Sequence, residues 1–215
     1  MAALSALAPF EPVARVDYVS QGRLLVVADD AMRARQAVAD LRASLSCAVL
    51  WCGSGTLQVE LADVVAGQLV SLRGHLGAFE LVFRSAPGAE QVAPFDLVLD
   101  LRPVPAFQMA DRPQGYYHAA FNADYAVAVQ ELPQMVGEFE KPKFFAYRES
   151  ICAHSRSKKD GCNRCIEVCS TGAIRAAGDH VEIDAHLCMG CGGCATVCPS
   201  GAMSYQYPRV ADRGV

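Results

Sequence analysis

Eight of the ten cysteines lie between positions 152 and 198, most of them in C-x-x-C spacings. In a secreted chain such a pattern would predict disulfides. The sequence before Arg15 contains no Lys or Arg, so it lacks the positively charged region that opens a secretory signal, and we expect a cytoplasmic protein. Clustered cysteines in a chain that is not exported favour a metal site over disulfides.

Composition excludes several other classes of protein. The 215 residues carry a net charge of -4 with 20% charged residues, whereas a nucleic-acid-binding domain normally shows a clustered basic surface. A membrane-spanning helix needs about 18 or more consecutive apolar residues, and charged residues, Gln or Gly interrupt every apolar run. We therefore expect no nucleic-acid partner and no membrane span.

The part before the cysteine cluster has ordinary signals of a mixed α/β domain. Leu24–Ala28 and Cys47–Trp51 are short apolar runs typical of buried strands, and between them apolar residues recur at helical spacing. Alternating or apolar segments predict four more strands, and a further helix is expected at 122–131. The four predicted strands are 57–61, 67–73, 78–84 and 95–101.

These signals predict an α+β chain in three parts. Residues 1–137 form a mixed α/β domain with a docking or regulatory role, and residues 138–149 form a linker around Lys141-Pro142-Lys143. Residues 150–215 form a small cysteine-rich domain. In that domain residues 162–174 align with residues 191–203 at a constant offset of 29, which predicts a pseudo-twofold repeat.

Within the repeat, the second copy has the spacing of a bacterial iron-sulfur protein. Beginning at Cys188 it reads C-x-x-C-x-x-C-x-x-x-C-P, in which three thiolates surround one cubane and the fourth reaches a second cubane. Residues 150–206 thus resemble the two-cluster (2 x 4Fe-4S) bacterial ferredoxin family. The resemblance implies that Cys188, Cys191, Cys194 and Cys169 hold one cluster. It also implies that Cys162, Cys165 and Cys198 hold three corners of the other.

The fourth ligand of this other cluster is not obvious, because Lys159 stands where the repeat would place a cysteine. We predict that Cys152 is the displaced ligand, reached through a longer loop at 153–161. Alternatively, Cys152 only packs in the core, which would leave a 3Fe-4S centre or a labile fourth iron, or His154 is the ligand. The predicted cofactors are two 4Fe-4S clusters, the first being 3Fe-4S if Cys152 is not a ligand.

Other interpretations of the cysteines explain fewer of them. Cys162/Cys165 and Cys188/Cys191 could form a zinc ribbon, but Cys169, Cys194 and Cys198 would then have no role. Cys47 and Cys52 lie in the α/β part and are expected to be structural.

A cluster held by four thiolates has no open coordination site but can exchange single electrons. We therefore expect a non-catalytic electron-transfer protein or subunit that passes electrons between a dehydrogenase or reductase and an acceptor. The alternative is an iron-sulfur scaffold, maturation or redox-sensing protein. The part around Val98–Leu101 and Gly115–Tyr117 is loosely similar to iron-sulfur proteins associated with formate dehydrogenase systems, which implies a redox partner protein of that kind.

Overall fold

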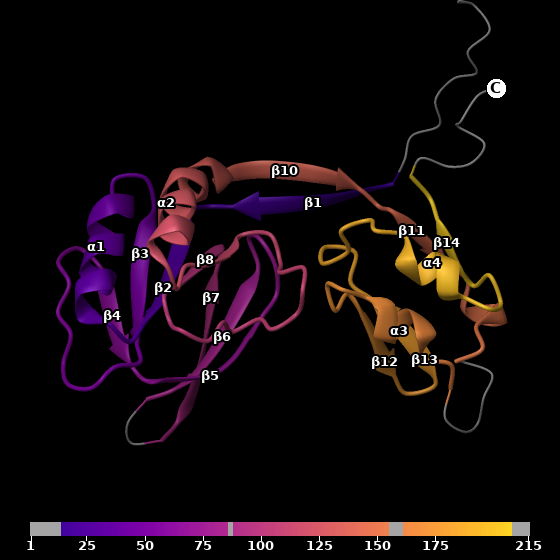
Figure 1. Cartoon of the computed structure of the whole chain (residues 1–215), viewed down its shortest axis with the longest axis horizontal. Helices are drawn as coiled ribbons and strands as arrows, with labels where there is room; N and C mark the ends of the chain where they lie inside the picture. The colour runs from indigo at the N-terminus through magenta and orange to yellow at the C-terminus, as the bar shows by residue number, and fades with distance from the viewer. Residues whose placement is uncertain (1–13, 86–87, 155–160, 208–215) are drawn as a thin grey trace, which may run out of the picture. The chain divides into compact units, whose positions relative to one another are not determined.

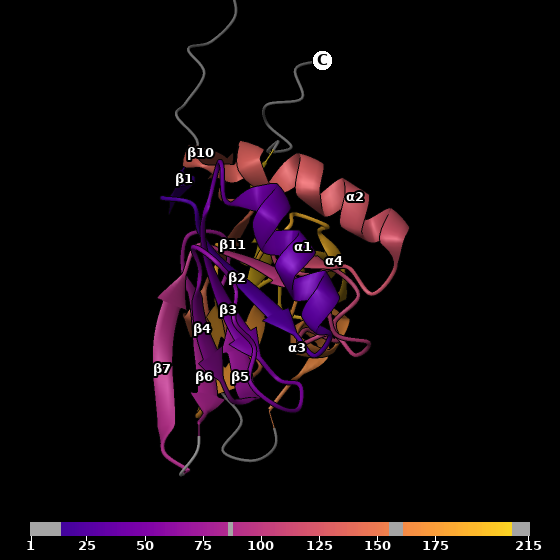
Figure 2. The same ribbon diagram turned by 90° about the vertical axis from the view of Figure 1, so that its left-hand side faces the viewer.

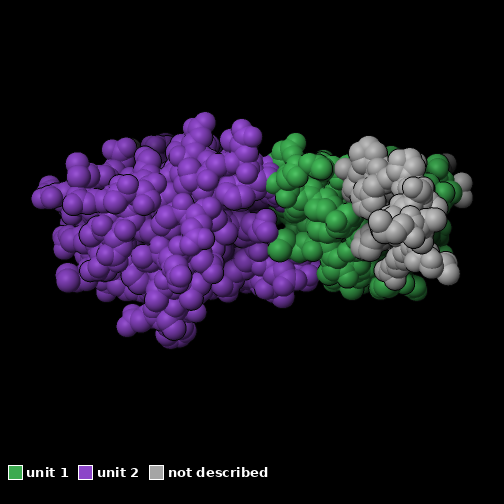
Figure 3. Space-filling model, turned by 90° about the horizontal axis from the view of Figure 1, so that it is seen from above, with its two compact units in different colours: residues 1–17, 140–169, 173–215 green, residues 18–139, 170–172 purple. Residues whose placement is uncertain are grey.

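The computed structural model describes residues 14–85, 88–154 and 161–207. It divides the chain into two compact units, coloured separately in Figure 3. The α/β unit comprises Tyr18–Phe139 and Ser170–Gly172. The cysteine-rich unit comprises Met1–Asp17, Glu140–Cys169 and Ala173–Val215. Among the described residues, none of the helices combines the length and the apolar character that crossing a membrane would require.

The centre of the α/β unit is a five-stranded parallel sheet with strand order β4-β3-β2-β8-β9 (Figure 1). The strands are β2 Arg23–Ala28, β3 Ser46–Trp51, β4 Asp63–Ala66, β8 Leu97–Asp100 and β9 Tyr116–His118. Every residue of Leu24–Ala28 is buried. Burial on both faces explains why this central strand is a continuous apolar run rather than an alternating one.

One face of this sheet is covered by helix α1, Ala31–Leu41, which Figure 2 shows in front of the parallel strands. The helix begins where the Asp30 carboxylate accepts a hydrogen bond of 3.0 Å from the Arg33 backbone N–H. Its buried residues, Ala34, Ala37, Val38 and Leu41, recur at helical spacing. The second helix, α2 Asn122–Glu131, continues into a 3-10 turn, η1 Leu132–Met135.

The opposite face packs against a three-stranded antiparallel sheet. Its strands are β5 Gln68–Arg73, β6 Phe79–Arg84 and β7 Glu90–Phe95. Leu25 and Val27 of β2 share one apolar core with Phe79, Leu81 and Phe83 of β6. The unit therefore has three layers, with α1 on one side of the parallel sheet and the antiparallel sheet on the other.

Two of the strand predictions are wrong. Residues 57–61 form no strand, because Leu61 is 80% exposed with a positive φ of 59° and Leu57 alone is buried. The predicted strand 95–101 has the wrong bounds, since a strand is present there only at Leu97–Asp100, as β8, and Phe95 is the last residue of β7. All four residues of β8 are buried, so its alternating polarity does not mark a solvent-exposed face.

The cysteine-rich unit consists of two short β pairs and two short helices. Strand β11, Phe145–Tyr147, pairs antiparallel with β14, Met203–Tyr205, and β12, Ile174–Ala177, pairs with β13, His180–Ile183. The helices are α3 Arg164–Val168 and α4 Gly193–Val197, and a 3-10 turn, η2, covers Glu149–Ile151. A further two-stranded sheet joins β1 Arg15–Ser20 and β10 Gly137–Pro142.

The segment 138–149, predicted as a linker, thus contains most of β10 and all of β11. Phe145 in β11 is buried and belongs to the apolar core of the cysteine-rich unit. This segment is therefore an ordered part of the structure.

Within the α/β unit, the buried carboxylate of Asp96 holds the start of β2. It is 1% exposed and accepts hydrogen bonds from the backbone N–H groups of Gln21 and Arg23, at 2.9 and 3.0 Å, and from the Arg23 guanidinium at 2.6 Å. Burial alone would raise the pKa of Asp96, but these donors outweigh it and hold the pKa below its usual range.

We expect Asp96→Asn to destabilise the α/β unit by about 1–3 kcal/mol at pH 7, because the charged acceptor of several hydrogen bonds is lost. A carboxylate with a lowered pKa stabilises the fold above about pH 4, and this stabilisation is lost as the pH falls through the folded-state pKa. The difference between wild type and variant should therefore shrink on acidification. The free energy of unfolding is measured by denaturant unfolding, followed by the fluorescence of Trp51. Trp51 is a buried residue of β3 and the single Trp of the chain.

The matched control is Glu80→Gln, which removes a carboxylate paired with Arg73 at the surface of the same unit. Because that pair is exposed, the change should be within about 1 kcal/mol at every pH. Equal losses in the two variants would contradict the role assigned to Asp96.

Candidate metal centre

Each copy of the cysteine repeat contains one short helix at the same place in its sequence. Helix α3 begins between Cys162 and Cys165 and ends directly before Cys169. Helix α4 begins between Cys191 and Cys194 and ends directly before Cys198. Helices of five residues are not stable by themselves, so their conformation depends on what the flanking cysteines contact.

The cysteines that end the two helices also have the same backbone conformation. Cys169 has φ -75° and ψ 102°, and Cys198 has φ -75° and ψ 110°. The chain after each is held in the same way, because Ala173 O accepts from Asp184 N at 2.8 Å and Ala202 O accepts from Arg148 N at 2.9 Å. Both cysteines therefore leave their helix in the same local geometry.

The first group of thiols surrounds Cys165, which is half-buried. Burial raises the pKa of the Cys165 thiol, and the nearby thiolates of Cys152, Cys162 and Cys198 raise it further. Cys152 is 7% exposed and lies in the apolar core of the unit. The cysteines whose charges act on Cys165 are thus the three others that the sequence assigns to the same cluster, including Cys152; this set of four is called nest 1.

The second group of thiols surrounds Cys194. Burial raises its pKa to about 11, with further contributions from the thiolates of Cys188, Cys191 and Cys169. Burial likewise raises the pKa of Cys188, where the charges of Cys169 and Cys191 act in the same direction. These four residues, called nest 2, are the other predicted set. Among the ten cysteines, all of which are described, Cys191 is the exposed one.

The sulfur of Cys198 receives several donors. Its Sγ accepts from Met203 N at 3.4 Å and lies 3.7 Å from the Ser200 hydroxyl oxygen. Burial would raise the pKa of Cys198, but donors from Met203, Ser200 and Ala202 lower it overall. Such donors to sulfur are one of the means by which a protein adjusts the potential of an iron-sulfur cluster.

Backbone geometry around nest 2 depends on glycine at position 190. Gly190 has φ 75°, and a Cβ atom there would lie 2.7 Å from the ring of Phe144. The loop between Cys188 and Cys191 can therefore follow this path only without a side chain at that position.

Sequence reasoning did not identify Lys141 as part of this site. Its Nζ donates to the carbonyl oxygens of His186 at 2.6 Å and Cys188 at 2.8 Å. Burial lowers the pKa of Lys141, while the negative charges of Cys188 and Asp184 oppose this shift. No local pattern connects Lys141 to the cysteine motif, because it precedes Cys188 by 47 residues.

His154, the remaining alternative ligand of nest 1, is 7% exposed. Its Nδ1 lies 3.2 Å from the carbonyl oxygen of Cys162, so this nitrogen contacts the backbone. Lys159, which replaces the leading cysteine of the first copy, lies outside the described residues.

The zinc-ribbon interpretation does not fit this arrangement. It requires Cys162, Cys165, Cys188 and Cys191 to share one site, whereas Cys165 lies among the thiols of nest 1 and Cys188 among those of nest 2. Cys47 belongs to the α/β unit, where burial raises its pKa to about 11, and burial also raises the pKa of Cys52. A thiol with a raised pKa is a poor nucleophile, consistent with a packing role.

A set of four thiols matches the donor set of a cubane iron-sulfur cluster, which cysteine thiolates typically hold in fours. Four neighbouring thiolates repel one another, and iron removes that repulsion when it binds them. The residues present therefore fit the cofactor that the motif predicts.

Comparison with known proteins agrees with this chemistry. Residues 160–202 match the family model of the 4Fe-4S dicluster domain. Hydrogenase-4 component A of Escherichia coli is 45% identical over 40 residues, which are 19% of this chain and 20% of that protein. A subunit of the ion-translocating oxidoreductase complex of Methanosarcina acetivorans is 42% identical over 43 residues, or 20% of this chain and 16% of that protein.

A third relative, Ferredoxin 7Fe of Hydrogenibacillus schlegelii, is 38% identical over 42 residues, which are 20% of this chain and 54% of that protein. The chain thus spans a fifth or less of the length of the first two relatives and about half of the third. These matches concern the cysteine-rich part of the chain. They show that residues 160–202 are an iron-sulfur domain of the 4Fe-4S ferredoxin type.

Proposed function

We propose that this chain is an electron-transfer protein or subunit that carries two 4Fe-4S clusters and passes electrons between a dehydrogenase or reductase and an acceptor. Nest 1, consisting of Cys152, Cys162, Cys165 and Cys198, would hold one cluster. Nest 2, consisting of Cys169, Cys188, Cys191 and Cys194, would hold the other. The proposal is supported by the match of residues 160–202 to the 4Fe-4S dicluster domain and by the charges that act on Cys165 and Cys194, which divide the eight cysteines into two sets of four.

A cubane bound by four thiolates exchanges one electron at a time and offers no open iron to a substrate. The chain's own residues would set the conditions of that exchange. Nest 1 includes Cys152, which is buried in the apolar core, whereas nest 2 includes the exposed Cys191. Because exposure shortens the distance to a partner protein, nest 2 is the side at which we expect electrons to enter or leave.

The names of the relatives support a role in electron transfer. One is a component of a hydrogenase, another belongs to an oxidoreductase complex and the third is a ferredoxin. A redox partner protein is therefore the expected ligand of this chain, and the α/β unit is proposed to dock or regulate it. The link to formate dehydrogenase systems stays a prediction.

Anaerobically purified protein should contain about eight iron and eight sulfide atoms per chain, because each of two cubanes supplies about four of each. Dithionite should reduce both clusters reversibly, and the reduced protein should pass its electrons to an artificial acceptor. Iron and sulfide analysis measures the cluster content, and EPR before and after re-oxidation shows whether the reduction is reversible. Clusters that disintegrate on the first redox cycle would instead favour the scaffold or sensing role.

We expect Cys152→Ser to convert the cluster of nest 1 into a 3Fe-4S centre, because only three cysteine ligands remain there. The iron content should fall by about one atom per chain, and the EPR signal of an oxidised 3Fe-4S centre should appear. The matched control is Cys47→Ala, which removes a buried cysteine of the α/β unit and should leave the iron content unchanged. The alternative is one 3Fe-4S and one 4Fe-4S cluster, which together hold seven irons, the number in the name of the relative Ferredoxin 7Fe. Wild-type protein with about seven irons would show that Cys152 is not a ligand.

Exchange of one ligand between the two copies can be tested with paired substitutions. Cys165→Ala and Cys198→Ala both damage nest 1, so the double variant should keep one intact, reducible 4Fe-4S cluster. Cys165→Ala with Cys169→Ala damages both nests and should keep none. Spin-quantified EPR of the dithionite-reduced proteins distinguishes the two. If the second pair also kept one intact cluster, Cys169 would belong to nest 1 and the exchange would not exist.

A further inference from the structure

The turn that carries Cys188 of nest 2 is held by two charged side chains, Asp184 and Lys141. This turn, Asp184–Cys188, lies between β13 and the Cys188–Cys191 loop and contains no helix or strand. Besides the backbone hydrogen bond from Asp184 N to Ala173 O, its position depends on side-chain contacts.

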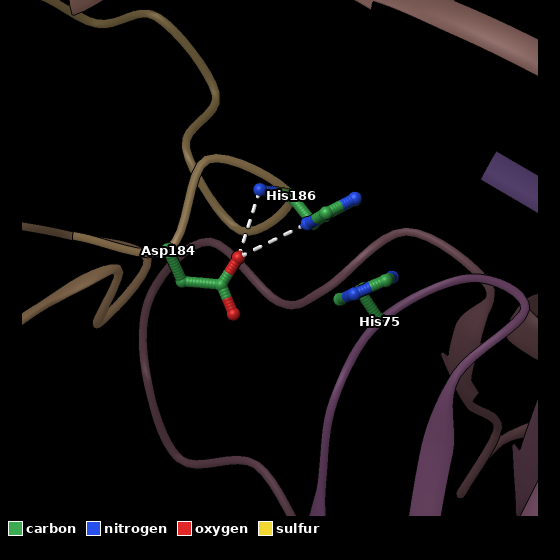
Figure 4. A group of neighbouring side chains, drawn as sticks. All are labelled: His75, Asp184 and His186. Carbon is green, nitrogen blue, oxygen red and sulfur yellow. Dashed lines mark hydrogen bonds and ion pairs between the residues drawn. The ribbon is translucent and has the colours of Figure 1, made fainter. Parts of the chain in front are cut away.

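Asp184 binds the N–H groups of the turn (Figure 4). Its Oδ1 accepts from His186 N at 2.8 Å and from Leu187 N at 3.4 Å, and its backbone oxygen accepts from Cys188 N at 3.3 Å. The His186 ring nitrogen Nδ1 lies 3.5 Å from the same Oδ1. The N–H groups of His186, Leu187 and Cys188 are thus bound within the turn itself.

Lys141 binds the carbonyl groups of the same turn from strand β10. Its Nζ lies 2.6 Å from His186 O and 2.8 Å from Cys188 O. One of these carbonyls belongs to Cys188, a predicted cluster ligand, so the ammonium group is hydrogen-bonded to the backbone of that ligand. Lys141 is half-buried, so water screens its charge less than that of a surface lysine.

The charge has a defined effect on a cluster. One-electron reduction of a cubane adds one negative charge to it, and a nearby fixed positive charge stabilises the reduced state more than the oxidised state. From this placement we propose that Lys141 positions the turn carrying Cys188 and raises the reduction potential of the cluster in nest 2 relative to that in nest 1. The inference rests on the proposed function.

The test compares Lys141→Met with Lys143→Met in anaerobically reconstituted full-length protein. Both variants remove one positive charge from the same segment. Lys143 is exposed and its Nζ lies 5.3 Å from the centre of the Phe145 ring, so it serves as the control. Reduction potentials of both clusters are measured by EPR-monitored titration. Lys141→Met should lower the equilibrium constant for reduction of one cluster about tenfold, which corresponds to a fall in its potential of about 59 mV for one electron. The potential of the other cluster should not change. Lys143→Met should change neither by more than about twofold.

Two more variants separate charge from position. Lys141→Arg keeps the charge, so the equilibrium constant for reduction of each cluster should stay within about threefold of the wild-type value. Lys141→Gln keeps an N–H donor for the carbonyls but removes the charge, so it should keep both clusters and still lower the potential of one, even if Lys141→Met fails to fold. A wild-type potential in Lys141→Gln, or equal shifts in Lys141→Met and Lys143→Met, would overturn the inference. Wild-type protein without reducible clusters would instead refute the proposed function.

Discussion

Neighbouring thiolates raise one another's pKa, and a bound cation removes this repulsion, so the cysteine-rich unit depends on what its two sets of cysteines bind. Apart from the cysteines, its fully buried core has few members, namely Phe145, Ile174, Val181, Ala202 and Met203. Small units with so few buried side chains usually need disulfides or metals for stability. The cysteines that pack against this core would therefore stabilise the fold through bound iron as well as serve its chemistry. Folding and cofactor binding in this unit are then one process.

The two nests are similar in backbone but different in surroundings. The cysteines that end helices α3 and α4 share one backbone conformation, whereas the residues before the two helices, Asn163 and Gly192, differ in the sign of φ. Nest 1 takes its fourth thiol from Cys152, which follows η2, whereas nest 2 takes Cys188 from a turn held by Asp184 and Lys141. Two cofactors of the same type in such different surroundings are not expected to have equal potentials. A difference in potential gives electron transfer a direction, so the departures from symmetry carry as much function as the repeat.

The proposed ligands could be predicted from spacing because cysteine ligands are encoded locally. The grouping of Cys169 with Cys188, and of Cys198 with Cys165, followed from the ferredoxin resemblance, and Cys152 followed from the absence of a leading cysteine. Lys141 could not be found in this way, since its contact with Cys188 is a tertiary one with no sequence signature. In the α/β unit, the buried strands at 24–28 and 47–51 were predictable from their apolar runs. The error at 57–61 arose because Leu57 and Leu61 alternate with polar residues in a connection that has no neighbouring strand to pair with.

The α/β unit is best understood through what its buried polar groups do. Asp100 is fully buried and accepts hydrogen bonds from Arg102, from Ala106 N and from the Tyr116 hydroxyl group. Asp96 is likewise bound by Gln21 and Arg23. Among the described side chains, Ser20 Oγ is the buried polar atom without a hydrogen-bond partner. Carboxylates that already bind so many donors stabilise loops and strand ends and have no acceptor capacity left for a reaction. The buried carboxylates of the α/β unit thus serve its fold, and the docking or regulatory role proposed for this unit would depend on its surface.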